Sequence, residues 1–90
     1  MASRQSELVL QAKVNAKKGD VLAMEFLARR YFEGRGTYQC FQQSCYWSSI
    51  ALHQGMGCLK SLNVFAWKKL SPEEKLRVDK KLKKWFNKEV

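Results

Sequence analysis

The sequence has few cysteines that could form disulfides and few prolines that could interrupt a helix. Its 90 residues include one proline and three cysteines, and no two cysteines form a CxxC pair. An odd number of such thiols argues against a disulfide framework and favours a reducing compartment, so we expect a cytoplasmic protein. No apolar run approaches the roughly 18 residues that a membrane-spanning helix requires. Residues 1–5 lead directly into a polar stretch, which predicts no secretory signal.

Acidic side chains are also scarce. The chain has eight of them against 17 lysines and arginines, which gives a net charge of +9. Residues 60–90 hold ten of the basic and four of the acidic side chains. Such a basic end favours an acidic partner, which charge alone leaves open as nucleic acid, a membrane surface or an acidic protein face.

Strand signals are weak, because β-branched residues are few and no alternation of apolar and polar residues persists. Helix signals are dense, which predicts an all-α fold. Ser6 and Asp20 are caps for the first two helices, and the first helix has Leu8, Ala12 and Ala16 on one stripe. We expect one domain with a tail at 1–5, a leading helix at 6–19, a helix pair at 20–55, a fourth helix at 56–70 and a basic helix at 71–90.

The last helix has the clearest start signal. Ser71 is its N-cap, Pro72 occupies the first turn, and Glu74 completes a capping box. The helix then buries an apolar stripe of Val78, Leu82, Trp85 and Phe86. Elsewhere Phe26, Tyr31 and Trp47 are interpreted as core, while Phe32, Phe65 and Trp67 remain open between core and contact roles.

Two glycines surround an arginine at Gly34-Arg35-Gly36. A phosphate-binding loop places its glycines after a strand and directly before a helix N-terminus. Here they follow a helix and lack the GK[ST] ending, which favours a helix-ending turn. We therefore expect a reversal of the chain at this point and no phosphate loop.

A period of 36 residues separates Gly19-Asp20 from Gly55-Met56, as in helical repeat arrays. Residues 16–55 resemble the Sel-one-like repeat family, a relative of the tetratricopeptide repeat. The family pattern is met at Gly19, Asp20, Ala23, Leu27, Tyr31, Gly34, Gly36, Trp47, Ala51 and Gly55, with Ala28 where the pattern has glycine. Beyond this range the chain departs from it, with Asn63 in place of a leucine. The resemblance implies a short α/α solenoid of about five helices, in which one good repeat is flanked by degenerate half-repeats.

The resemblance also implies a protein-binding surface on the first helix of each repeat. In this chain that surface comprises Leu22, Glu25, Arg29, Phe32, Phe65 and Lys68. A mixed apolar and charged surface of this kind accepts a helix or peptide. The simpler interpretation of Glu25 and Arg29, spaced i,i+4, is a solvated ion pair.

The basic last helix is the alternative functional centre. Lys80, Lys81, Lys83 and Lys84 are candidate anion-binding residues that would neutralise phosphates. The same lysines also fit an ordinary amphipathic helix, and no known nucleic-acid-binding motif accompanies them.

Catalytic and metal-binding residues are few. His53 is the single histidine, and Ser49 lies one turn before it without a third orienting group. Cys40, Cys45 and Cys58 are ligand types that zinc accepts, but their spacing fits no ligand pair, so we interpret them as small buried apolar residues. The sequence therefore predicts no enzyme, no metal and no cofactor.

The resemblance implies a non-enzymatic, protein-binding adaptor or regulator whose partner is another protein, and we expect it to be bacterial or phage-borne. A homodimer or an obligate complex is expected, because a short stack leaves its ends uncovered. The alternative is a small nucleic-acid-binding regulator that uses residues 75–88.

Overall fold

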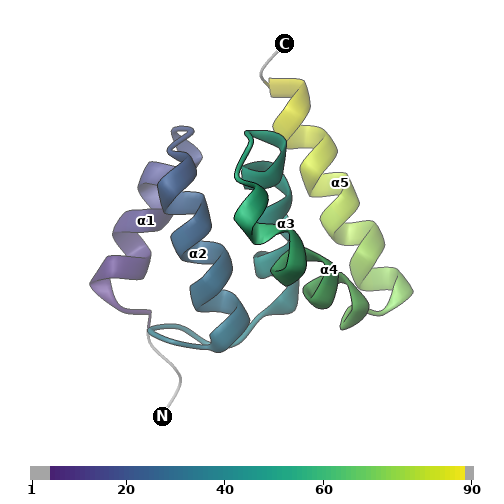
Figure 1. The fold of residues 1–90 in the computed structure, drawn as a ribbon, viewed down its shortest axis with the longest axis horizontal. Helices are drawn as coiled ribbons and strands as arrows, with labels where there is room; N and C mark the ends of the chain where they lie inside the picture. The colour runs from purple at the N-terminus through teal and green to yellow at the C-terminus, as the bar shows by residue number, and fades with distance from the viewer. Residues whose placement is uncertain (1–4, 89–90) are drawn as a thin grey trace.

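The computed structural model describes residues 5–88, which form α1 (Glu7–Lys17), α2 (Val21–Glu33), α3 (Phe41–His53), a short 3-10 turn η1 (Gly57–Leu59), α4 (Lys60–Lys68) and α5 (Pro72–Lys88) (Figure 1). No strand occurs between residues 5 and 88, so the predicted all-α fold is confirmed. The expected tail at 1–5, except Gln5, and the last two residues of the expected 71–90 helix lie outside the described residues. Within that range, no helix combines the length and apolar character needed to cross a bilayer.

Helices α1, α2 and α5 begin at the capping residues that the sequence indicates, whereas α3 and α4 begin without a side-chain cap in the described part of the chain. Ser6 Oγ accepts a hydrogen bond from the Val9 amide at 3.2 Å, and the Asp20 carboxylate accepts from two amides of the first turn of α2. Ser71 and Glu74 form the expected capping box. The Ser71 amide donates to Glu74 Oε1 at 2.9 Å, and the Glu74 amide donates to Ser71 Oγ at 3.2 Å. These bonds satisfy amides that have no acceptor inside the helix.

The loop after α2 both reverses the chain and holds the start of α1. Gly34 is the left-handed C-cap of α2, and Gly36 also has a positive φ of 76°. The Gly36 carbonyl accepts from the Ser6 amide at 2.7 Å, and a Cβ on Gly36 would lie 2.9 Å from Ser6 Oγ. Beside this contact, Gln5 Nε2 donates to the Tyr31 hydroxyl at 2.7 Å. The interpretation of these glycines as a helix-ending turn is confirmed.

Helix α3 is the centre of the molecule. Helices α2, α4 and α5 pack against it, while α1 packs on α2 at the edge of the molecule (Figure 1). The side chains of α3 include no aspartate, glutamate, lysine or arginine. Its small hydroxyls instead hydrogen-bond to neighbouring helices: Ser44 Oγ donates to the Ala28 carbonyl at 2.9 Å, and Ser48 Oγ accepts from Asn63 Nδ2 at 2.8 Å. Asn63, which stands where the repeat pattern has leucine, therefore joins α4 to α3 through a polar contact.

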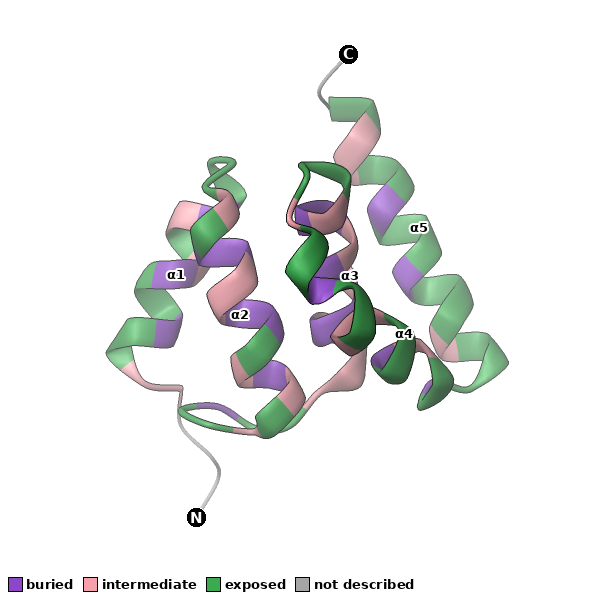
Figure 2. Cartoon of the chain, in the orientation of Figure 1, coloured by how far each residue is buried: buried purple, intermediate pink, exposed green. Residues whose placement is uncertain are grey.

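The core lies where the helices face α3 and where α1 faces α2 (Figure 2). Trp47 is 4% exposed, which confirms it as a core residue. Its Nε1 is buried and has no hydrogen-bond partner among the described residues, as is also true of Trp85 Nε1. The Trp85 and Trp47 rings meet edge to face with centroids 6.0 Å apart. Phe26, Trp85 and Phe86 are half-buried and pack against the core.

One predicted core position is wrong. Leu8 was expected on the buried stripe of α1 with Ala12 and Ala16, but it is 67% exposed and Val9 is fully buried instead. Residues 8, 12 and 16 span about 80° of the helix circumference and residues 9, 12 and 16 about 60°, so helical spacing alone does not decide between Leu8 and Val9. Val9 also packs beside Gly36, since its Cγ2 would lie 3.4 Å from a Cβ on that glycine.

Candidate partner-binding surfaces

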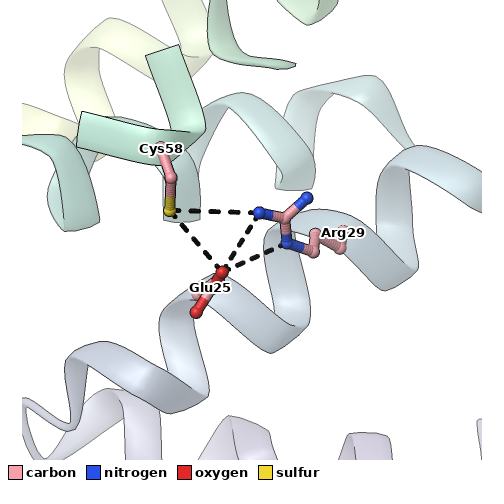
Figure 3. Close-up of polar contacts among 3 residues, drawn as sticks. All are labelled: Glu25, Arg29 and Cys58. Atoms are coloured by element: carbon pink, nitrogen blue, oxygen red, sulfur yellow. Dashed lines mark hydrogen bonds and ion pairs between the residues drawn. The ribbon is translucent and has the colours of Figure 1, made fainter. Parts of the chain in front are cut away.

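The sequence-predicted protein-binding residues lie on α2 and α4, and we call them the α2–α4 strip. Its polar part is a cluster of Glu25, Arg29 and Cys58 (Figure 3). Glu25 Oε2 accepts from Arg29 Nε at 3.2 Å and from Arg29 Nη2 at 3.1 Å, so the expected i,i+4 ion pair forms. Cys58 Sγ lies 3.7 Å from Glu25 Oε2 and 3.9 Å from Arg29 Nη2. The cluster links α2 to the turn before α4 and leaves the Arg29 side chain 47% exposed.

The apolar part of the strip is a pair of phenylalanines. Phe32 and Phe65 meet edge to face with ring centroids 5.7 Å apart, and Phe32 makes a similar contact with Phe41 at 5.6 Å. Phe32 is half-buried, but Phe65 remains 51% exposed. Lys69 Nζ lies 5.2 Å from the centroid of the Phe65 ring. Of the residues left open between core and contact roles, Phe32 and Trp67 are half-buried and Phe65 is exposed.

Leu22 and Lys68 stand apart from these two clusters. Leu22 is 66% exposed and borders a shallow hollow of about 300 Å³ with residues of α1, including Leu8, and with Phe26. Lys68 is exposed near the end of α4, and within residues 5–88 its side chain takes part in no ion pair. The strip therefore has an aromatic and polar centre, a separate leucine at one end and a lysine at the other.

The four candidate anion-binding lysines do not share one face of α5. Lys81 Nζ lies 5.6 Å from the centroid of the Tyr46 ring, on the side that faces α3. Lys83 lies on another side, where its Nζ is 3.4 Å from Asp79 Oδ2 in an ion pair. Lys80 and Lys84 are exposed. Each step along a helix turns by about 100°, which separates residues that look like one block in the sequence.

The residues considered for catalysis make other contacts. Ser49 Oγ accepts from Asn63 Nδ2 at 3.0 Å, and the exposed His53 ring lies against Phe86 with centroids 4.6 Å apart. Across residues 5–88, no group of three or more His, Cys, Asp or Glu side chains is arranged to hold a metal ion.

The cysteines differ in environment. Cys45 is fully buried as expected and Cys40 is half-buried. The interpretation of Cys58 as a buried apolar residue is wrong, because Cys58 lies in η1 and is exposed. Burial raises the pKa of the Cys45 thiol to about 12. Burial likewise raises the pKa values of Tyr31 and Tyr46. These groups are packing residues that hold their protons, not ionised side chains.

Sequence reasoning missed a second set of basic residues around Trp85. A hollow of about 130 Å³ is lined by Lys17, Lys18 and Gly19 from the end of α1 and by Trp85 and Lys88 from α5. These two segments are far apart in the chain, so no local pattern brings them together. The signal available in the sequence was the spacing of Arg77, Lys81, Lys84 and Lys88, which repeats at helical intervals along α5.

Comparison with known proteins finds no relative: the chain matches no family model, and no curated protein or solved structure is significantly similar to it.

Proposed function

We propose that this chain is a non-enzymatic, protein-binding adaptor or regulator that binds its partner on the α2–α4 strip. The carrying observation is Phe65, a ring that is 51% exposed and yet fixed against Phe32. A large apolar side chain that is already ordered loses little conformational freedom on binding, which makes it a suitable anchor.

The charges around Phe65 favour an acidic, amphipathic helix as the partner segment. Lys68 and Lys69 are exposed three and four residues after Phe65, and the Arg29–Glu25 ion pair on α2 adds no net charge. An incoming helix would place apolar side chains on Phe65 and carboxylates beside the cations. The resemblance to Sel-one-like repeats supports the same class of partner.

The test uses a synthetic acidic amphipathic peptide with leucines at helical spacing and glutamates between them. Anisotropy of the labelled peptide measures its affinity, and amide chemical shifts of the isotope-labelled protein map its site. We expect Phe65→Ser to reduce the affinity by roughly tenfold or more, as for an interface anchor. Val64→Ser is the matched control, because Val64 is 46% exposed on the adjacent position of the same helix.

Two outcomes would contradict the proposal. One is equal loss of affinity in the Val64→Ser and Phe65→Ser variants, and the other is a set of shifts centred on α5. With the native host's extract, we expect the wild-type chain and the Val64→Ser variant to capture the same protein after nuclease treatment. The Phe65→Ser variant should not capture it.

The homodimer or obligate complex stays a prediction. The outer side of α1 offers Leu10 and Val14, each 48% exposed, as apolar surface for such an assembly. Sedimentation equilibrium that shows a stable monomer over a wide concentration range would count against the homodimer.

A further inference from the structure

Four basic side chains form a row along α5. Arg77, Lys81, Lys84 and Lys88 are spaced i, i+4, i+7 and i+11, which places them on one side of the helix over about 16 Å. All four are exposed. None of the three ion pairs found within residues 5–88 includes a member of this row. Glu73 and Glu74 lie one turn before Arg77. Glu74 is held in its capping box, where the hydrogen bond from the Ser71 amide is the main cause of its lowered pKa and the charge of Arg77 is a smaller one.

The row continues onto α1. Lys17 and Lys18 line the same hollow of about 130 Å³ as Trp85 and Lys88, and no acidic residue lines it. We call the six cations the basic row: Arg77, Lys81, Lys84, Lys88, Lys17 and Lys18. Because two separate helices supply it, the row is a property of the folded molecule and not of the α5 sequence alone.

Aromatic rings lie between the cations. Trp85 forms part of the wall of the hollow, and its ring meets the half-buried Tyr46 edge to face with centroids 6.5 Å apart. Lys81 Nζ lies over Tyr46 at 5.6 Å from the ring centroid. An indole beside several lysines offers a stacking surface for a base next to cations for its phosphates.

The surroundings of the basic row favour nucleic acid over an acidic protein or a membrane. Among residues 5–88, the large apolar side chains that are exposed are Leu8, Leu10, Val14, Leu22, Tyr38, Val64, Phe65 and Leu76, and none of these belongs to the row or lines its hollow. A protein interface has an apolar core, and a membrane-bound helix inserts apolar side chains. Here the accessible chemistry is cationic and aromatic.

We propose that the basic row binds the phosphate backbone of a single-stranded nucleic acid and that Trp85 stacks on one of its bases. This surface is separate from the α2–α4 strip and does not rest on the protein-binding function proposed above. Recognition is independent of base sequence, because lysines contact phosphates and an indole stacks on any base.

The test measures binding of a short fluorescein-labelled oligothymidylate by anisotropy across a series of salt concentrations. Lys81→Gln/Lys84→Gln removes two members of the row. Lys75→Gln/Lys83→Gln is the matched control, because it changes the net charge equally on the same helix, at two exposed positions that helical rotation places on other sides of α5 than the row. Each phosphate contact on a single strand contributes about 0.7 to the slope of log affinity against log salt concentration. We expect the row variant to lose about 1.4 from this slope, and the control to keep it. Trp85→Phe, with its far-UV circular dichroism unchanged, should bind roughly threefold to tenfold more weakly through poorer stacking.

Several results would overturn the proposal. An equal loss of slope in the two double-lysine variants would mean that only net charge matters and not the basic row. Absence of oligothymidylate binding at low salt would also contradict the proposal. Tighter binding of a duplex of the same length would contradict the single-strand assignment. Competition by polyglutamate at the same charge concentration would assign the row to acidic proteins. These outcomes do not involve Phe65, so they are distinguishable from failure of the protein-binding proposal.

Discussion

The contact between Gly36 and Ser6 makes a quantitative prediction about how α1 is attached. Gly36→Ala places a Cβ 2.9 Å from Ser6 Oγ, at a residue whose φ is 76°. The left-handed backbone costs an alanine about 1–2 kcal/mol. The hydroxyl must also move away, which breaks its cap to the Val9 amide and costs about 1 kcal/mol more. We therefore expect Gly36→Ala to reduce the free energy of unfolding by about 2–3 kcal/mol.

A double-mutant cycle separates the two terms. Ser6→Ala removes the hydroxyl and so loses the cap by itself, at a cost of about 1 kcal/mol. In that background Gly36→Ala has no oxygen to displace and should cost only the backbone term, about 1–2 kcal/mol. Urea unfolding of the four proteins, followed by far-UV circular dichroism and tryptophan fluorescence, measures the coupling. If Gly36→Ala costs the same in both backgrounds, the steric argument is wrong and the effect belongs to the backbone alone.

Further predictions concern the core and its ionisable groups. Trp47→Ala should cost about 3–5 kcal/mol in urea unfolding, whereas Trp47→Phe should cost much less because it keeps a ring and removes a buried N–H that has no acceptor among the described residues. Asn63→Leu, which restores the repeat pattern, should destabilise by about 1 kcal/mol since Ser48 and Ser49 lose their donor; a stabilised variant would contradict the hydrogen-bonded role. Thiol labelling followed by mass spectrometry should modify exposed Cys58 in the native protein and buried Cys45 only on unfolding; fast labelling of Cys45 would refute its burial. Burial raises the pKa of Cys45 from 9.0 to about 12, so the folded state keeps this proton longer than the unfolded state. The stabilisation that comes from keeping this proton is complete below about pH 9 and is lost as the pH rises towards 12. Urea unfolding midpoints measured across that range will detect the loss.

The sequence was sufficient for the helices because their start and stop signals are local. The caps at Ser6, Asp20 and Ser71 each act within one turn, and a glycine ends α2 through its own φ. The burial of Val9 in place of Leu8 could not be predicted from local signals. It depends on the loop at Gly36, which lies 27 residues further along the chain and meets α1 only in the folded molecule.

The candidate surfaces show the same division. The Glu25–Arg29 pair follows from i,i+4 spacing, and the sequence predicted it. The four candidate anion-binding lysines of α5 were predicted as one site because they are close in the sequence. Helical rotation instead places Lys83 beside Asp79 and away from Lys81. The meeting of Lys17 and Lys18 with Trp85 depends on tertiary packing, so the sequence held no local signal for it.

The central position of α3 has a consequence for genetics. Both proposed surfaces lie on helices that pack against α3. The α2–α4 strip lies on α2 and α4, and most of the basic row lies on α5. A screen that scores loss of either activity would therefore recover α3 substitutions in both classes, since a disturbed support displaces both surfaces together. Only alleles on the outward side chains would separate the two phenotypes, and the first informative alleles to build are those at Phe65 and at Lys81 with Lys84.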